Sequence, residues 1–117
     1  MAKRFLIIVP VNKEAYLKAF ESKTKADAII QEKVGLVIRK TDVDAFERPM
    51  MMFSARGRKK SQLQVNDRAT YYAKLPSAED DIFGPAIIMG DIDGTPAGLT
   101  EKDALAVRDE INNLRIV

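Results

Sequence analysis

Residues 81–103 constrain the fold of this chain more than any other stretch. Residues 82–89 form an apolar run in which Gly84 and Pro85 mark the entry to the predicted strand. A Gly- and Asp-rich turn follows at residues 90–95. A helical pattern then begins at Thr100. The stretch therefore predicts a strand, a turn and a helix. The buried strand would form the spine of a small sheet, and the last helix would fold back over it.

The last helix has clear sequence signals at its start. Thr100 is its predicted N-cap, and Asp103 at the third helical position suits both a capping box and the positive end of the helix dipole. Apolar residues then share one face, which predicts the side that packs on the sheet: Ala104, Val107, Ile111 and Leu114.

Short apolar or β-branched runs predict the other strands. The four runs lie at residues 5–9, 36–38, 50–53 and 69–73. The last of them is expected to be a short strand or an extended segment. Pro49 stands just before the third run, where a strand tolerates proline. Residues 42–48 are expected to form a loop or one helical turn.

Two further helices are expected in the first third of the chain. Asn12 is predicted to cap a helix at residues 13–21, where apolar residues repeat at four-residue spacing. Thr24 with Asp27 resembles a capping box, so a second helix would begin there and end before Gly35. Glycine takes the left-handed conformation of a helix C-terminus at low cost.

These elements predict one α+β domain over residues 1–117. It would contain a single small sheet, mostly antiparallel or mixed, of about five strands with two or three helices packed on it. A chain of 117 residues can bury one core but rarely two. The three consecutive methionines at residues 50–52 are expected to fill this core rather than to bind a ligand.

The chain contains no cysteine and no histidine. Disulfides, thiol nucleophiles and Ser-His-Asp triads are therefore excluded, which argues against most hydrolases. No apolar run approaches the roughly 20 residues of a membrane span, and the basic N-terminus precedes too short an apolar segment for a secretory signal. We expect a cytoplasmic protein with no membrane partner and no cofactor.

The most basic stretch lies between two predicted strands, at residues 55–61. Its four cations are candidates for phosphate contacts with nucleic acid: Arg56, Arg58, Lys59 and Lys60. Tyr71 and Tyr72 are candidate stacking residues for the bases. A solvated hairpin tip explains the same cations without any partner.

Acidic residues raise a third hypothesis, a metal-dependent enzyme. The candidate carboxylates are Asp80, Asp81, Asp91 and Asp93. Asp91 and Asp93 before a glycine resemble part of a calcium loop, but the third ligand and the bidentate Glu of such a loop are missing. Hydrogen bonds from these aspartates to the turn backbone are the favoured explanation, and we predict no metal site.

Four motifs in a fixed order carry a family resemblance: AIIQEKVG at 28–35, VNDRAT at 65–70, IFGPAIIMG at 82–90 and LTEKD at 99–103. Over about residues 26–105 the chain resembles the domain of unknown function family numbered 3846. Members of this family occur in bacteria and often in phages and mobile elements. The chain departs from the family in its single Gly35, its basic loop and a longer segment before the second helix. The motifs are structural, and the resemblance implies no activity for particular residues.

Three functional hypotheses follow. The leading one is a small non-enzymatic accessory protein of phage or mobile-element type. It would bind a host protein or a small ligand in the host cytoplasm and interfere with a host process or defence system. Nucleic-acid binding through the basic loop is the second hypothesis, and a metal-dependent enzyme is the third. The sequence leaves a homo-oligomer open.

Overall fold

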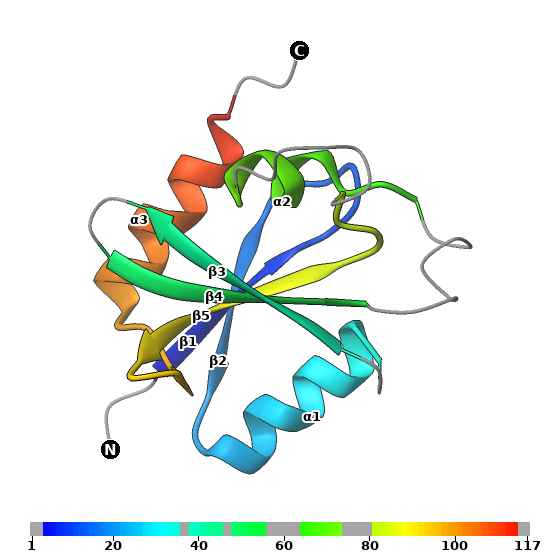
Figure 1. Cartoon of the computed structure of the whole chain (residues 1–117). Helices are drawn as coiled ribbons and strands as arrows, with labels where there is room; N and C mark the ends of the chain where they lie inside the picture. The colour runs from blue at the N-terminus through cyan, green and yellow to red at the C-terminus, as the bar shows by residue number, and fades with distance from the viewer. Residues whose placement is uncertain (1–3, 36–37, 46–47, 56–63, 74–80, 115–117) are drawn as a thin grey trace.

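The computed structural model describes residues 4–35, 38–45, 48–55, 64–73 and 81–114, which form six strands and three helices (Figure 1). In chain order the elements are β1 (Arg4–Val9), β2 (Tyr16–Phe20), α1 (Lys23–Lys33), β3 (Ile38–Ala45), β4 (Arg48–Ala55), α2 (Asp67–Tyr72), β5 (Ala86–Ile92), β6 (Thr95–Ala97) and α3 (Glu101–Asn112).

The six strands form one sheet. Five of them lie in the order β2-β1-β5-β4-β3, and β6 also pairs with β5, past the residues of β5 that pair with β1. Every pairing is antiparallel. The strand predicted to be the spine, β5, lies between β1 and β4 and is almost entirely buried over its first five residues. The predicted α+β fold with a single small sheet is therefore confirmed.

The sheet is covered on both faces because its strands are apolar on both sides. Side chains alternate between the faces along a strand, so neighbouring residues enter different cores. Met50 and Met52 pack with residues of α2 and α3, whereas Met51 and Phe53 pack with Ile30 of α1. The three methionines are at most 1% exposed, which confirms their predicted place in the core.

A buried asparagine joins α2 to the sheet. Asn66 is the N-cap of α2, where its side chain accepts a hydrogen bond from the Ala69 N–H. Its amide nitrogen donates to the carbonyls of Val9, at the end of β1, and Gly84. All of its side-chain polar atoms are thus paired, although the residue is only 1% exposed.

A second asparagine fixes the connection between β1 and β2 to α3. Asn112 Oδ1 accepts from the Ala15 N–H at 2.7 Å, and its Nδ2 donates to the Ala15 carbonyl at 3.2 Å. The side chain therefore pairs with Ala15 as a neighbouring strand would.

The predictions for α3 and two glycines are confirmed. Thr100 caps α3 by accepting from the Asp103 N–H at 3.2 Å. The predicted apolar face of α3 is buried at Ala104, Val107 and Ile111, with Leu114 partly buried beside them. Gly35 follows α1 with φ 112°, and Gly84 enters the β5 segment with φ 74°.

The predicted helix at residues 13–21 is wrong, because Tyr16–Phe20 forms the strand β2 instead. Its five residues pair with β1, from Ile8 opposite Tyr16 to Arg4 opposite Phe20. Asn12 has φ 58°, which places it in a left-handed turn rather than at a helix N-cap. Pairing with an available apolar strand outweighs the helical spacing of a short segment.

Other boundaries also differ from prediction. Residues 42–45 and Arg48 are not a loop or helical turn but continue β3 and β4, which pair over eight residues each. The segment predicted as a strand at 69–73 belongs largely to α2, because Asn66 supplies an N-cap. The cap of α1 is Ser22 rather than Thr24, and the turn after β5 continues into β6, which completes a hairpin.

Candidate functional site

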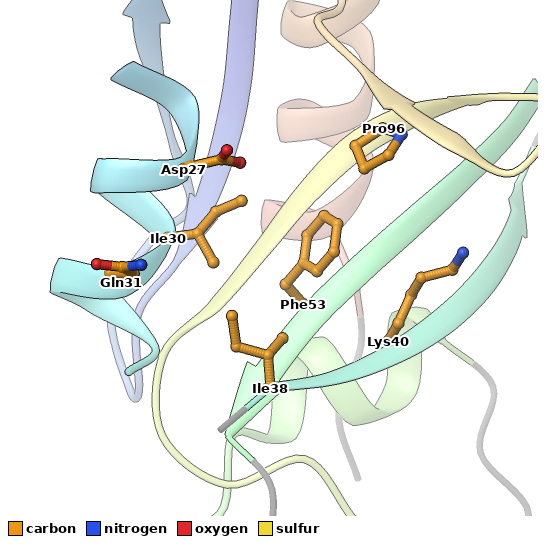
Figure 2. Close-up of a pocket in the computed structure, with 7 residues that line it drawn as sticks. All are labelled: Asp27, Ile30, Gln31, Ile38, Lys40, Phe53 and Pro96. Atoms are coloured by element: carbon orange, nitrogen blue, oxygen red, sulfur yellow. The ribbon is translucent and has the colours of Figure 1, made fainter. Parts of the chain in front are cut away.

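On the face of the sheet that α1 covers, the covering is incomplete, and this leaves a groove. Only α1, of eleven residues, packs on this face among the described helices, with Ala26 and Ile30 buried against it. Between α1 and β3 lies a hollow of about 390 Å³, which we call the α1–β3 groove. Figure 2 shows the residues that line it, which are Asp27, Ile30, Gln31, Ile38, Lys40, Phe53 and Pro96.

The floor of the groove is apolar. Phe53 of β4 is 8% exposed and Ile30 of α1 is 5% exposed, so both belong to the core and present only a small surface to the groove. Ile38, at the start of β3, is half-buried and packs against the same core. This surface favours an apolar or flat group over a charged one.

The two walls carry different polar groups. Asp27 and Gln31 are exposed and lie one turn apart on α1, which places them on the same side of the helix. Lys40 is exposed on β3, opposite Phe53 in the strand register. A carboxylate and an amide thus stand on the α1 side of the floor, and an ammonium stands on the β3 side (Figure 2).

The β5–β6 hairpin borders one end of the groove (Figure 2). Asp91 Oδ1 accepts a hydrogen bond from the Gly94 N–H at 2.7 Å, and Asp93 and Gly94 take the positive φ values that the turn needs. Lys40 Nζ donates to the Gly94 carbonyl at 3.4 Å. Pro96 of β6, which is opposite Asp91, lines this end.

The carboxylates considered as candidate metal ligands do not form a cluster among the described residues. Asp91 serves the β5–β6 turn, as predicted, and Asp93 lies in the same turn. Asp81 is half-buried and precedes Ile82, while Asp80 lies outside the described residues. In the described ranges no group of three or more Asp and Glu side chains could hold a metal ion.

The predicted basic site lies outside the described residues, at Arg56, Arg58, Lys59 and Lys60. Its candidate stacking residues are both in α2. Tyr71 is 45% exposed, but Tyr72 is 6% exposed and donates its hydroxyl to Glu110 Oε1 at 3.0 Å. Tyr72 is therefore a core residue and does not present a stacking face.

Sequence reasoning missed the groove residues Asp27, Gln31 and Lys40. One signal is present in the sequence: Asp27 and Gln31 are four residues apart, and they share a helix face next to Ile30. The position of Lys40 opposite this face depends on the sheet order, which the sequence does not display.

Comparison of the chain with protein-family models, with curated proteins and with solved structures found no match. The resemblance to family 3846 therefore stays a prediction. In the part of the chain that the structure describes, no helix has the length and apolar character to span a membrane.

Proposed function

We propose that the protein is a non-enzymatic binding protein that holds a small organic anion with a flat apolar body in the α1–β3 groove. The observation that carries this proposal is the lining of the groove. An apolar floor lies between a carboxylate and amide on one wall and an ammonium on the other. Pockets for small molecules commonly combine apolar surface with a few polar groups that orient the ligand, and a volume of about 390 Å³ lies within their usual range.

The walls define the two ends of such a ligand. Asp27 accepts hydrogen bonds, and Gln31 both accepts and donates them, so the α1 wall suits an amino or hydroxyl group. Lys40 suits a carboxylate or phosphate. Its bond to the Gly94 carbonyl is 3.4 Å long, beyond the usual range for N–H···O bonds, and an anionic oxygen would form a stronger, charge-assisted bond.

Of the two kinds of partner expected from the sequence, the groove supports the small ligand. Binding of a host protein, a phage or mobile-element origin and interference with a host process stay predictions. Nucleic-acid binding through residues 56–60 and metal-dependent catalysis also stay predictions. No described contact favours either of them over a small ligand.

The probe 4-aminobenzoate tests this proposal because it has an amine and a carboxylate at opposite ends of one ring. We would titrate it into isotope-labelled protein and follow the amide signals by NMR. Aniline, which lacks the carboxylate, and benzoate, which lacks the amine, are the matched control ligands. We expect shifts centred on Asp27, Gln31, Lys40 and Phe53 that saturate, with weaker binding of both controls. Absence of saturable shifts, or shifts centred on another surface, would reject the groove as the site.

A further inference from the structure

The outer edge of β3 lies at the end of the sheet. In the strand order β2-β1-β5-β4-β3, β3 pairs with β4 on one side, and no other described strand pairs with it. An edge strand presents backbone N–H and C=O groups that can pair with a further strand. At eight residues, β3 is long enough for such pairing.

The charges on β3 change sign along the strand. Lys40 and Asp42 are both exposed, and they share the face of α1 because they lie opposite Phe53 and Met51. Thr41 lies between them. A strand with only cations would repel its own copy, whereas a cation followed by an acid is complementary to itself when two copies run antiparallel.

We propose that β3 pairs antiparallel with β3 of a second copy of this chain, centred on Thr41. In this register, Lys40 of each copy lies opposite Asp42 of the other, so two pairs of opposite charge form. In an antiparallel pair, a residue whose backbone N–H and C=O point toward the partner strand must lie opposite another such residue. The register can therefore change only in steps that keep these residues opposite each other. The register centred on Lys40 places the two Lys40 residues opposite each other, and the register centred on Asp42 places the two Asp42 residues opposite each other with Lys40 opposite Asp44. Each of them contains a pair of like charges that the register centred on Thr41 avoids.

The central residue supports this register independently. Thr41 Oγ1 is buried and has no hydrogen-bond partner in the described structure. An unpaired buried hydroxyl is unfavourable and uncommon. In the proposed pair the two Thr41 residues lie opposite each other, with Cβ atoms close enough for a hydrogen bond between their hydroxyls after rotation about χ1.

The pairing also extends the α1–β3 groove. A two-fold axis at Thr41 runs perpendicular to the sheet, so the α1 helices of both copies lie on the same face. Asp42 of the second copy then stands beside Lys40 at the outer wall of each groove and competes with an anionic ligand for its ammonium, so the dimer should bind such a ligand more weakly than the monomer does. The inference does not rest on the proposed ligand, because the strand edge exists whether or not the groove is occupied.

Sedimentation velocity over a wide range of protein concentration tests the pairing. Strand addition relies on backbone hydrogen bonds over a few residues, so we expect a dimer that dissociates on dilution. Lys40→Asp and Asp42→Lys each oppose like charges and should raise the dimer dissociation constant about tenfold or more. A mixture of these two variants restores both opposite-charge pairs and should form a heterodimer. Lys18→Asp, the same charge change on exposed β2, is the matched control and should leave the dimer intact.

Amide hydrogen exchange of the wild-type chain gives a second test that needs no variant. Protection of β3 amides should rise with protein concentration, while that of β2 amides should not. Three results would overturn the proposal: a wild-type monomer at all concentrations, a dimer that tolerates both charge reversals, or a mixture that stays monomeric. A monomer would mean that Lys40 and Asp42 instead keep this edge from pairing.

Discussion

The side chain of Asn66 donates a hydrogen bond to the carbonyl of Val9 at 2.7 Å, although 57 residues separate the two in sequence. The same nitrogen donates to Gly84 at 2.9 Å. One buried amide thus connects α2, the end of β1 and the approach to β5. Its contacts join three segments that are distant in the chain.

Replacement of Asn66 by Ala should strongly destabilise the protein. The change leaves the Val9 and Gly84 carbonyls without this donor and removes the N-cap of α2, so we expect a loss of about 3 kcal/mol in the free energy of unfolding. Urea denaturation measures this loss. Asn113→Ala, at an exposed position after α3, is the control and should change the free energy by less than about 0.5 kcal/mol. Equal stability of the two variants would contradict the role of Asn66.

Replacement of Asn112 by Ala should loosen the connection between β1 and β2. Both hydrogen bonds to Ala15 are lost, and because the site is only partly buried, water can replace one of them. We expect a cost of about 1–2 kcal/mol in the free energy of unfolding. Hydrogen exchange of the Ala15 amide should also become faster. An unchanged exchange rate would show that Asn112 does not hold this segment.

Gly98 should not tolerate alanine. A Cβ at this position would overlap Cβ of Arg4 and lie 2.7 Å from Cζ of Phe20. Phe20 can turn aside, but Cβ of Arg4 is fixed to the backbone of β1, so the strands must shift. We expect thermal and urea denaturation to show a loss of about 1–3 kcal/mol. A combined G98A and Phe20→Leu variant should recover only part of it, and full recovery would locate the clash at Phe20 alone.

The parts of the fold that local signals determine could be predicted from the sequence. Thr100 and Asp103 mark the start of α3, and the apolar run before them forms the central strand β5. The segment at Tyr16 could not be assigned in this way, because the four-residue spacing of its apolar residues favours a helix. Its pairing with β1 decides the outcome, and that pairing is not local.

Asn66 shows the same limit at a turn. The residue type suits both a turn and a helix N-cap, and the strand predicted at residues 69–73 left no place for a helix after it. In the structure its side chain caps α2 and also reaches Val9 and Gly84. The groove was harder still to predict, because Asp27 and Lys40 belong to elements whose relative positions follow from the sheet order.

The binding of 4-aminobenzoate by wild-type protein and by Lys40→Met tests the proposed groove most directly. Methionine keeps most of the length of the side chain but removes its charge, so the probe should lose one charge-assisted contact and bind about five- to tenfold more weakly. Aniline, which has no carboxylate, should bind both proteins equally, and Lys18→Met should bind 4-aminobenzoate as the wild type does. Equal affinity of wild type and Lys40→Met for 4-aminobenzoate would contradict the proposed site.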